Sequence, residues 1–269
     1  MSHSAIKRLL IFEPYPMGQG GGNLRTLAYL LQYMDRERIE PIVVAPMNTE
    51  FMEDIRAAGV RTLILEPPAT VGRYAGQVLK EALWRRARST FDLLRYNLAI
   101  AHLVSREGVD VVYCNGIRAL LTVGLGAKLA RRPVLWYIKG ALENGLLDRV
   151  GFVLADRVLF MAAANRDDRY PRLVRWYRTK IGIVKNGVDR RVIDDVLARD
   201  HDGLRAELGI RRNRVNIIIL GQVYRPKGVH VVLERLKQLV TDHPEAVLWI
   251  VGDHVLEEYR PYRQELENI

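Results

Sequence analysis

The chain has 269 residues, of which 49% are hydrophobic and 27% are charged, and its formal net charge is +10. A chain of this composition buries a substantial apolar core, which excludes a disordered or fibrous protein. The surplus of positive charge favours anionic partners, which are phosphorylated small molecules, nucleic acid or an acidic membrane surface.

The cysteine content and the positions of the charged residues indicate the compartment in which the protein works. The single cysteine, Cys114, excludes an internal disulfide and a cysteine-rich metal site, and it fits a reducing compartment. Lys7 and Arg8 interrupt the only apolar stretch near the start, so we expect no secretory signal. The longest run without a charged residue, 14–24, is rich in Gly and Pro, so we expect no membrane-spanning helix.

Short apolar, β-branched runs alternate along the chain with stretches of helical periodicity. Uninterrupted apolar runs are typical of strands that are covered on both faces, and strand–helix alternation is typical of a doubly wound parallel α/β fold. The predicted strands are 7–12, 41–45, 62–65, 110–114, 134–138, 157–161, 181–185, 216–220 and 247–251. The predicted helices are 24–34, 77–105, 119–130 and 229–240.

A break in this alternation follows Lys185. Residues 186–214 are polar and contain no β-branched run before Val215. We therefore expect a complete α/β domain over residues 1–185, a connector over 186–214, and an incomplete second α/β domain over 215–269.

The first predicted strand leads into a loop that contains Gly20, Gly21 and Gly22. Glycines at a strand-to-helix turn let backbone N–H groups approach an anion at the helix N-terminus. The dinucleotide-binding fingerprint does not fit, because Asn23 stands where a glycine is needed and the loop is too long. A ligand-facing loop and a plain flexible connection are the two interpretations.

Two later turns are also candidate ligand sites. Asn186 and Gly187 follow the last strand of the first domain and form a domain-exit turn or a ligand contact. In the second domain, a strand ends at Gly221, and the cations Arg225 and Lys227 precede a helix. Cations beside a helix N-terminus suit a diphosphate, and the alternative is a solvated basic turn.

The order of these motifs is more specific than each motif alone. A glycine-rich first loop, VKNGVD, LGQVYRPKG and LWIVGDH follow one another along the chain. This order resembles family 4 of the retaining glycosyltransferases, which have the GT-B fold. The resemblance implies a GT-B-like chain that transfers a hexosyl group from a UDP- or GDP-sugar, with retention of anomeric configuration and without a metal or other cofactor. The acceptor would be a saccharide or a lipid-linked molecule, bound mainly by the first domain.

The resemblance assigns roles to residues of the second domain. Lys227 matches the lysine that holds the donor diphosphate, beside the loop glycine Gly221. Gln222 stands where the family has an arginine, so one phosphate contact is missing, and Arg225 is the candidate to replace it. Gly252 matches the glycine near the nucleotide base.

In the first domain, the resemblance places Gly20, Gly21 and Gly22 near the reaction centre. Lys139 stands about where the family has a catalytic histidine. It is our catalytic candidate, although a lysine cannot simply take over a histidine's role. The alternative is a solvated lysine at a strand end.

The family also carries two glutamates separated by seven residues, which anchor the donor sugar and ribose. That pair would fall beyond Ile269, so we expect a truncated and inactive donor domain. We interpret the late acidic residues as a solvated helix face; they are Glu257, Glu258, Glu265 and Glu267.

Metal and nucleic-acid sites are less favoured. Asp200-His201-Asp202 matches an acid-x-acid metal motif, but an Asp that caps the following helix is the better interpretation, and we expect no metal. No nucleic-acid motif accompanies the positive charge, so we expect no nucleic-acid partner.

Two stretches, 73–95 and 166–180, hold six cations each and carry aromatic side chains. Cations beside an apolar helical face are typical of a helix lying on anionic lipid, whereas the alternative is an amphipathic helix packed on its own core. We expect a cytoplasmic protein, peripheral at the inner face of the plasma membrane. A non-catalytic acceptor- or membrane-binding module is the alternative function. The apolar face in the first stretch is formed by Leu79, Leu83, Trp84, Ala87 and Phe91.

Overall fold

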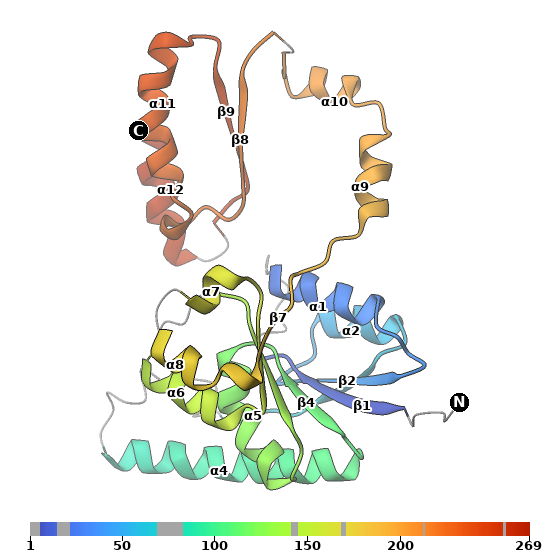
Figure 1. Cartoon of the computed structure of the whole chain (residues 1–269). Helices are drawn as coiled ribbons and strands as arrows, with labels where there is room; N and C mark the ends of the chain where they lie inside the picture. Colours follow the sequence, from blue (N-terminus) through green and yellow to red (C-terminus); the bar gives the residue numbers. More distant parts are fainter. Residues whose placement is uncertain are drawn as a thin grey trace. The chain divides into compact units, whose positions relative to one another are not determined.

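The computed structural model describes residues 6–14, 22–68, 83–140, 145–167, 171–211, 213–254 and 257–269, without the side chains of 83–87, 167 and 258. It divides the chain into two compact units, Met1–Val188 and Asp189–Ile269 (Figure 1). Each unit is described by itself.

Unit 1 is built on a parallel sheet of seven strands in the order β3-β2-β1-β4-β5-β6-β7. Consecutive strands are joined by crossovers on both sides of β1, which is the doubly wound arrangement that the apolar runs predict. The strands are β1 Lys7–Phe12, β2 Ile39–Ala45, β3 Arg61–Ile64, β4 Val111–Cys114, β5 Val134–Ile138, β6 Arg157–Phe160 and β7 Ile181–Ile183.

Helices cover both faces of this sheet because alternate strand residues point to opposite sides. Helices α1 (Gly22–Gln32) and α2 (Glu50–Ala57) pack on the face that includes Ile11 and Val43. The other face packs against α4 (Leu83–Arg106), α5 (Ile117–Leu129), α6 (Gly145–Leu154) and α8 (Pro171–Trp176). The short α7 (Ala163–Asp167) and the 3₁₀ turn η1 (Arg178–Lys180) complete the unit.

Close backbone contact holds α4 against α5. A Cβ atom at Gly126 would lie 2.5 Å from the carbonyl oxygen of Asn97, so a larger residue does not fit there. The buried Asn97 side chain accepts a hydrogen bond from the Gly126 N–H at 2.6 Å. This contact fixes the helix layer that supports β4 and β5.

Unit 2 contains a parallel pair of strands, β8 (Asn216–Leu220) and β9 (Val247–Val251). A small core of Val223, Val229, Tyr262 and Leu266 joins them to the helices that follow. Ile218 and Leu220 are exposed on the other face of the sheet. The helical elements of unit 2 are α9 Arg190–Leu197, α10 Asp202–Glu207, η2 Arg225–Lys227, α11 Val229–Asp242, η3 Glu257–Tyr259 and α12 Arg260–Glu267.

The parallel sheets confirm the α/β fold class. The predicted connector, 186–214, contains two short helices, α9 and α10, of which the sequence indicated only α10. The expected helix 77–105 is seen as α4 from Leu83, while residues 77–82 lie outside the described part. Within the described part, no helix combines the length and apolarity needed to cross a bilayer.

Candidate functional sites

A cluster of polar side chains lies at the carboxyl edge of the unit 1 sheet. Glu13, Asn115 and Lys139 each follow one of the adjacent strands β1, β4 and β5. Glu13 is only 3% exposed, and its Oε2 accepts a hydrogen bond from Asn115 Nδ2 at 2.5 Å. Loops at this edge are where open α/β folds bind ligands.

Burial brings two of these groups toward neutral pKa values. Desolvation raises the pKa of Glu13 to about 7, against the opposing effects of the Asn115 hydrogen bond and the Lys139 charge. Desolvation lowers the pKa of Lys139 to about 8, and the Glu13 charge opposes that change. Both groups can therefore exchange a proton near physiological pH.

Asn115 also keeps unused hydrogen-bonding capacity. Its Oδ1 is enclosed and has no hydrogen-bond partner in the part of the chain that the structure describes. A buried carbonyl oxygen without a donor is costly, so this atom is a candidate acceptor for a water molecule or a ligand hydroxyl.

Lys139 is half-buried, so it is not the freely solvated strand-end lysine of the alternative interpretation. Its Nζ donates to the carbonyl oxygen of Asn23 in the first turn of α1 at 3.2 Å. The same nitrogen lies 5.8 Å from the centroid of the Tyr137 ring. The lysine thus links the end of β5 to the start of α1.

The Asn186 side chain is likewise more than part of a plain turn. The Tyr137 hydroxyl lies 2.8 Å from Asn186 Oδ1 and 2.9 Å from the carbonyl oxygen of Val184, and it donates to one or the other. Asn186 Nδ2 donates to Thr26 Oγ1 at 3.4 Å. A Cβ at the neighbouring Gly187 would meet no atom of the described residues within 4 Å, so their packing does not require glycine there.

The glycine-rich loop is only partly visible. Gly22 begins α1, and its carbonyl oxygen accepts from Thr26 Oγ1 at 2.6 Å. Gly20 and Gly21 lie outside the described residues.

In unit 2, two glycine turns touch at the carboxyl ends of β8 and β9. The Gly221 N–H donates to the carbonyl oxygen of Val251 at 3.0 Å. A Cβ at Gly252, which has φ +141°, would lie 2.0 Å from the Gly221 carbonyl oxygen. Only glycine fits at position 252. Gly221 and Gly252 thus form a small surface of bare backbone, and the side chains of Gln222 and Asp253 follow it directly.

The cations beside this surface are not equivalent. Lys227 is exposed, and its Nζ lies 5.9 Å from the centroid of the Tyr224 ring. The Arg225 guanidinium pairs with Glu265 on α12 and lies 5.2 Å from the Tyr262 ring. Glu265 is therefore not a simple solvated residue, and Arg225 would have to leave a carboxylate to meet a phosphate.

The start of α11 is also contacted by α12. The Tyr262 hydroxyl accepts from the His230 backbone N–H at 3.2 Å and lies 2.8 Å from His230 Nδ1. Gly228 precedes the helix in the left-handed conformation at φ +70°. Gln222, after Gly221, is half-buried.

The acidic residues near α10 make a local turn, and the N-cap position of α10 is His201, which makes no side-chain capping bond. Asp200 Oδ1 accepts from the Asp202 backbone N–H at 2.9 Å, and α10 begins at Asp202. Among the residues that the structure describes, no three His, Cys, Asp or Glu side chains group as metal ligands.

The sequence interpretation missed Glu13 and Asn115. Each is a polar residue directly after an apolar strand, which is a usable signal for a ligand-facing position. Their contact could not be predicted in the same way, because it depends on β1 and β4 being neighbours in the sheet.

No protein-family model and no curated protein sequence matches the chain. Its fold matches solved structures. HepE from Anabaena, in complex with UDP and glucose, aligns with a TM-score of 0.66 and 19% identity over 97% of this chain and 64% of HepE. A glycosyltransferase from Rickettsia africae ESF-5 aligns with a TM-score of 0.74 and 14% identity over 98% of this chain and 65% of that one.

A third similar structure is assigned as a UDP-N-acetylglucosamine 2-epimerase from Listeria monocytogenes. Its TM-score is 0.56, and it is 13% identical over 99% of this chain and 67% of its own. At such identities the likeness shows the fold, and it confirms the GT-B-like α/β prediction. The chain spans 64% and 65% of the lengths of HepE and the Rickettsia protein.

Proposed function

We propose that the chain is a glycosyltransferase of the hexosyltransferase type, which uses a UDP- or GDP-sugar as donor and retains the anomeric configuration. The observation that carries the proposal is the pair of touching turns at Gly221 and Gly252, beside the exposed Lys227 and the start of α11. Backbone without side chains, a cation and a helix N-terminus together suit a diphosphate.

In this proposal, Lys227 and the α11 dipole stabilise the negative charge that develops on the leaving diphosphate. Electrostatic stabilisation of a leaving group by fixed groups of this kind requires no metal. Retention rests on the family resemblance. Gln222 leaves Lys227 as the main side-chain cation, since Arg225 is paired with Glu265.

The acceptor is proposed to bind to unit 1 through one of its hydroxyl groups. Asn115 Oδ1 can accept a hydrogen bond from such a hydroxyl, while Glu13 and Lys139 can take or give a proton near neutral pH. A saccharide and a lipid-linked sugar both offer that chemistry. A peripheral membrane location stays a prediction of the sequence.

Equilibrium titration with UDP- and GDP-sugars tests the donor half of the proposal. Lys227→Ala should weaken binding about tenfold or more, because a charge-assisted contact to a phosphate contributes ~1.5–3 kcal/mol. Lys237→Ala is the matched control, since Lys237 is an exposed lysine on α11, the helix that follows Lys227. No saturable binding of any nucleotide sugar would refute the proposal.

Product analysis separates transfer from the epimerase chemistry assigned to the Listeria structure. We expect an added acceptor to become glycosylated, and we expect the donor sugar to keep its configuration at C2. An epimerised donor without transfer would contradict the proposal.

A further inference from the structure

Helix α6 presents an apolar stripe to solvent. Leu146, Val150 and Val153 are 63%, 40% and 66% exposed. Their spacing of four and three residues places them on one face of the helix. Exposed apolar side chains that gather in this way mark an interaction surface more often than single ones do.

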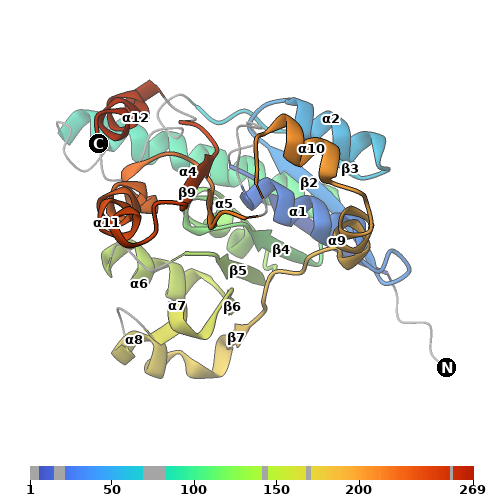
Figure 2. The ribbon, with the colours of Figure 1, turned by 90° about the horizontal axis from the view of Figure 1, so that it is seen from above.

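Trp176 extends the apolar stripe from a second element. It ends α8 and is 83% exposed, which is the largest exposed fraction among the described apolar side chains. The adjacent Tyr177 stacks on Phe152 of α6 with ring centroids 5.3 Å apart. Lys180 Nζ donates to the carbonyl oxygen of Ala155, directly after α6, at 2.7 Å. These contacts tie the segment that follows α8 to α6, and Figures 1 and 2 show α6, α7 and α8 on the same side of unit 1.

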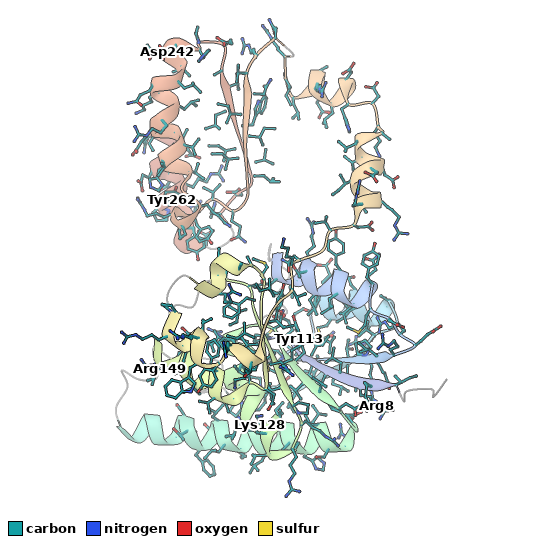
Figure 3. All side chains as sticks on the ribbon, in the orientation of Figure 1. Arg8, Tyr113, Lys128, Arg149, Asp242 and Tyr262 are labelled. Carbon is teal, nitrogen blue, oxygen red and sulfur yellow. The ribbon has the colours of Figure 1, made fainter. Side chains whose placement is uncertain are left out.

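The exposed charged side chains described on α6, α8 and η1 are all basic, and the nearby Asp156 is paired with Lys128. We define the α6–α8 surface as two sets of exposed residues. The apolar set is Leu146, Val150, Val153 and Trp176, and the basic set is Arg149, Arg172, Arg175 and Arg178. Among the described side chains of α6, α8 and η1, the one carboxylate is Asp148, which is buried. Within the described residues, these four arginines contact no carboxylate. Arg149 lies on the outer side of unit 1 in Figure 3.

We propose that the α6–α8 surface docks unit 1 on an anionic lipid membrane. Leucine, valine and tryptophan side chains gain by entering the boundary between headgroups and acyl chains, and tryptophan is enriched at that depth. The arginines meet the negative surface potential of the lipid, and each contributes about fivefold in affinity. Nucleic acid would use the arginines but would leave the three aliphatic side chains in water.

The surface takes Trp176 and three of its arginines from the second basic stretch of the sequence, 166–180, and it uses no residue of the first stretch, 73–95. On α4, Phe91, Leu94 and Leu98 are exposed beside Arg88 and Arg95, but Asp92 lies among them. Much of the first basic stretch lies outside the described residues, including Arg73, Tyr74 and Lys80. In the second stretch, Asp168, Arg169 and Tyr170 lie outside as well. The α6–α8 proposal uses none of these.

Vesicle co-sedimentation of the full chain tests the proposal without any sugar substrate. We expect binding to phosphatidylcholine vesicles that contain phosphatidylglycerol, weaker binding as salt rises, and little binding to phosphatidylcholine alone. Arg172→Glu with Arg175→Glu should weaken binding at least 25-fold on the basis of about fivefold per arginine. Val153→Glu should weaken it as well.

Tryptophan fluorescence gives a second readout. We expect a blue shift on addition of anionic vesicles that is smaller in Trp176→Phe. Trp84, Trp136 and Trp249 are common to both proteins, so the difference between their spectra reports Trp176. Circular dichroism should show each variant folded, since every substituted side chain is exposed.

Leu98→Glu on α4 is the matched control, and it should leave vesicle binding unchanged. Equal binding to neutral and anionic vesicles would overturn the proposal. So would loss of binding in Leu98→Glu with normal binding in Val153→Glu. Displacement of the vesicles by an oligonucleotide, together with an unchanged Trp176 spectrum, would assign the surface to nucleic acid instead.

Discussion

Asn115 Nδ2 donates to the buried Glu13 Oε2 at 2.5 Å, and so joins the ends of β4 and β1 through side chains. The two residues are 102 positions apart in the chain. Burial makes this carboxyl group carry a proton more readily than an exposed one, and the Asn115 N–H donor opposes that effect because it favours the charged form.

Glu13 should make the stability of the protein fall as pH rises through the acid range. Its pKa is about 7 in the folded chain against 4.5 ordinarily, so the folded state binds more protons between these values. The free energy of unfolding should drop by about 3 kcal/mol between pH 4.5 and 7 and then level off. Glu13→Gln should remove this component, as measured by denaturant titration across pH. Glu37→Gln, at an exposed turn, is the control, and a wild-type slope in Glu13→Gln would contradict the assignment.

Lys139 should make the stability of the protein rise with pH in the alkaline range. Its pKa is about 8 in the folded chain against 10.5 ordinarily, so the unfolded state binds more protons in that window. Stability should therefore gain a rising component between pH 8 and 10.5. Lys139→Met should lose that rise, which the same titrations measure at high pH. An identical alkaline profile in the variant would show that the lysine is not buried as described.

Gly252→Ala should disrupt the touching turns of unit 2. The new Cβ would lie 2.0 Å from the Gly221 carbonyl oxygen, at a φ that side chains rarely adopt. We expect a loss of about 2–4 kcal/mol, the range of severe overpacking and backbone strain. Hydrogen exchange should become faster at the Gly221 and Val223 amides, which bond to carbonyl oxygens of β9 and the turn after it.

The control for that substitution is Gly203→Ala. Gly203 lies in α10 with open space around its Cβ position, so alanine should be tolerated or should stabilise the helix slightly. Unchanged exchange at Gly221 in Gly252→Ala would contradict the close approach of the two turns.

Glu265→Gln should tighten nucleotide binding. The carboxylate pairs with Arg225, so its neutralisation frees the guanidinium for a phosphate. Because exposed pairs contribute only ~0.2–1 kcal/mol, the gain should be at most about fivefold, measured by calorimetric titration. Glu267→Gln is the control, since Glu267 pairs with Arg263 instead. Weaker binding in Glu265→Gln would mean that the carboxylate itself serves the site.

The sheet of unit 1 was largely predictable, since uninterrupted apolar runs such as Val134–Ile138 leave few alternatives. Amphipathic α9 was missed because Val192, Ile193 and Val196 are spaced among acidic and basic residues in a segment that is polar on average. The Arg225–Glu265 pair depends on α12 packing beside η2, which no local pattern encodes. Pairings of this kind decide which cations are available to a ligand. The sequence motif LGQVYRPKG alone therefore could not show that Lys227 is more available to a phosphate than Arg225.

The most direct measurement is a crystal structure of the chain with bound UDP. The account predicts the diphosphate beside the turns at Gly221 and Gly252, with Lys227 Nζ within about 3.2 Å of a phosphate oxygen. A diphosphate bound elsewhere, with Lys227 free in solvent, would contradict it.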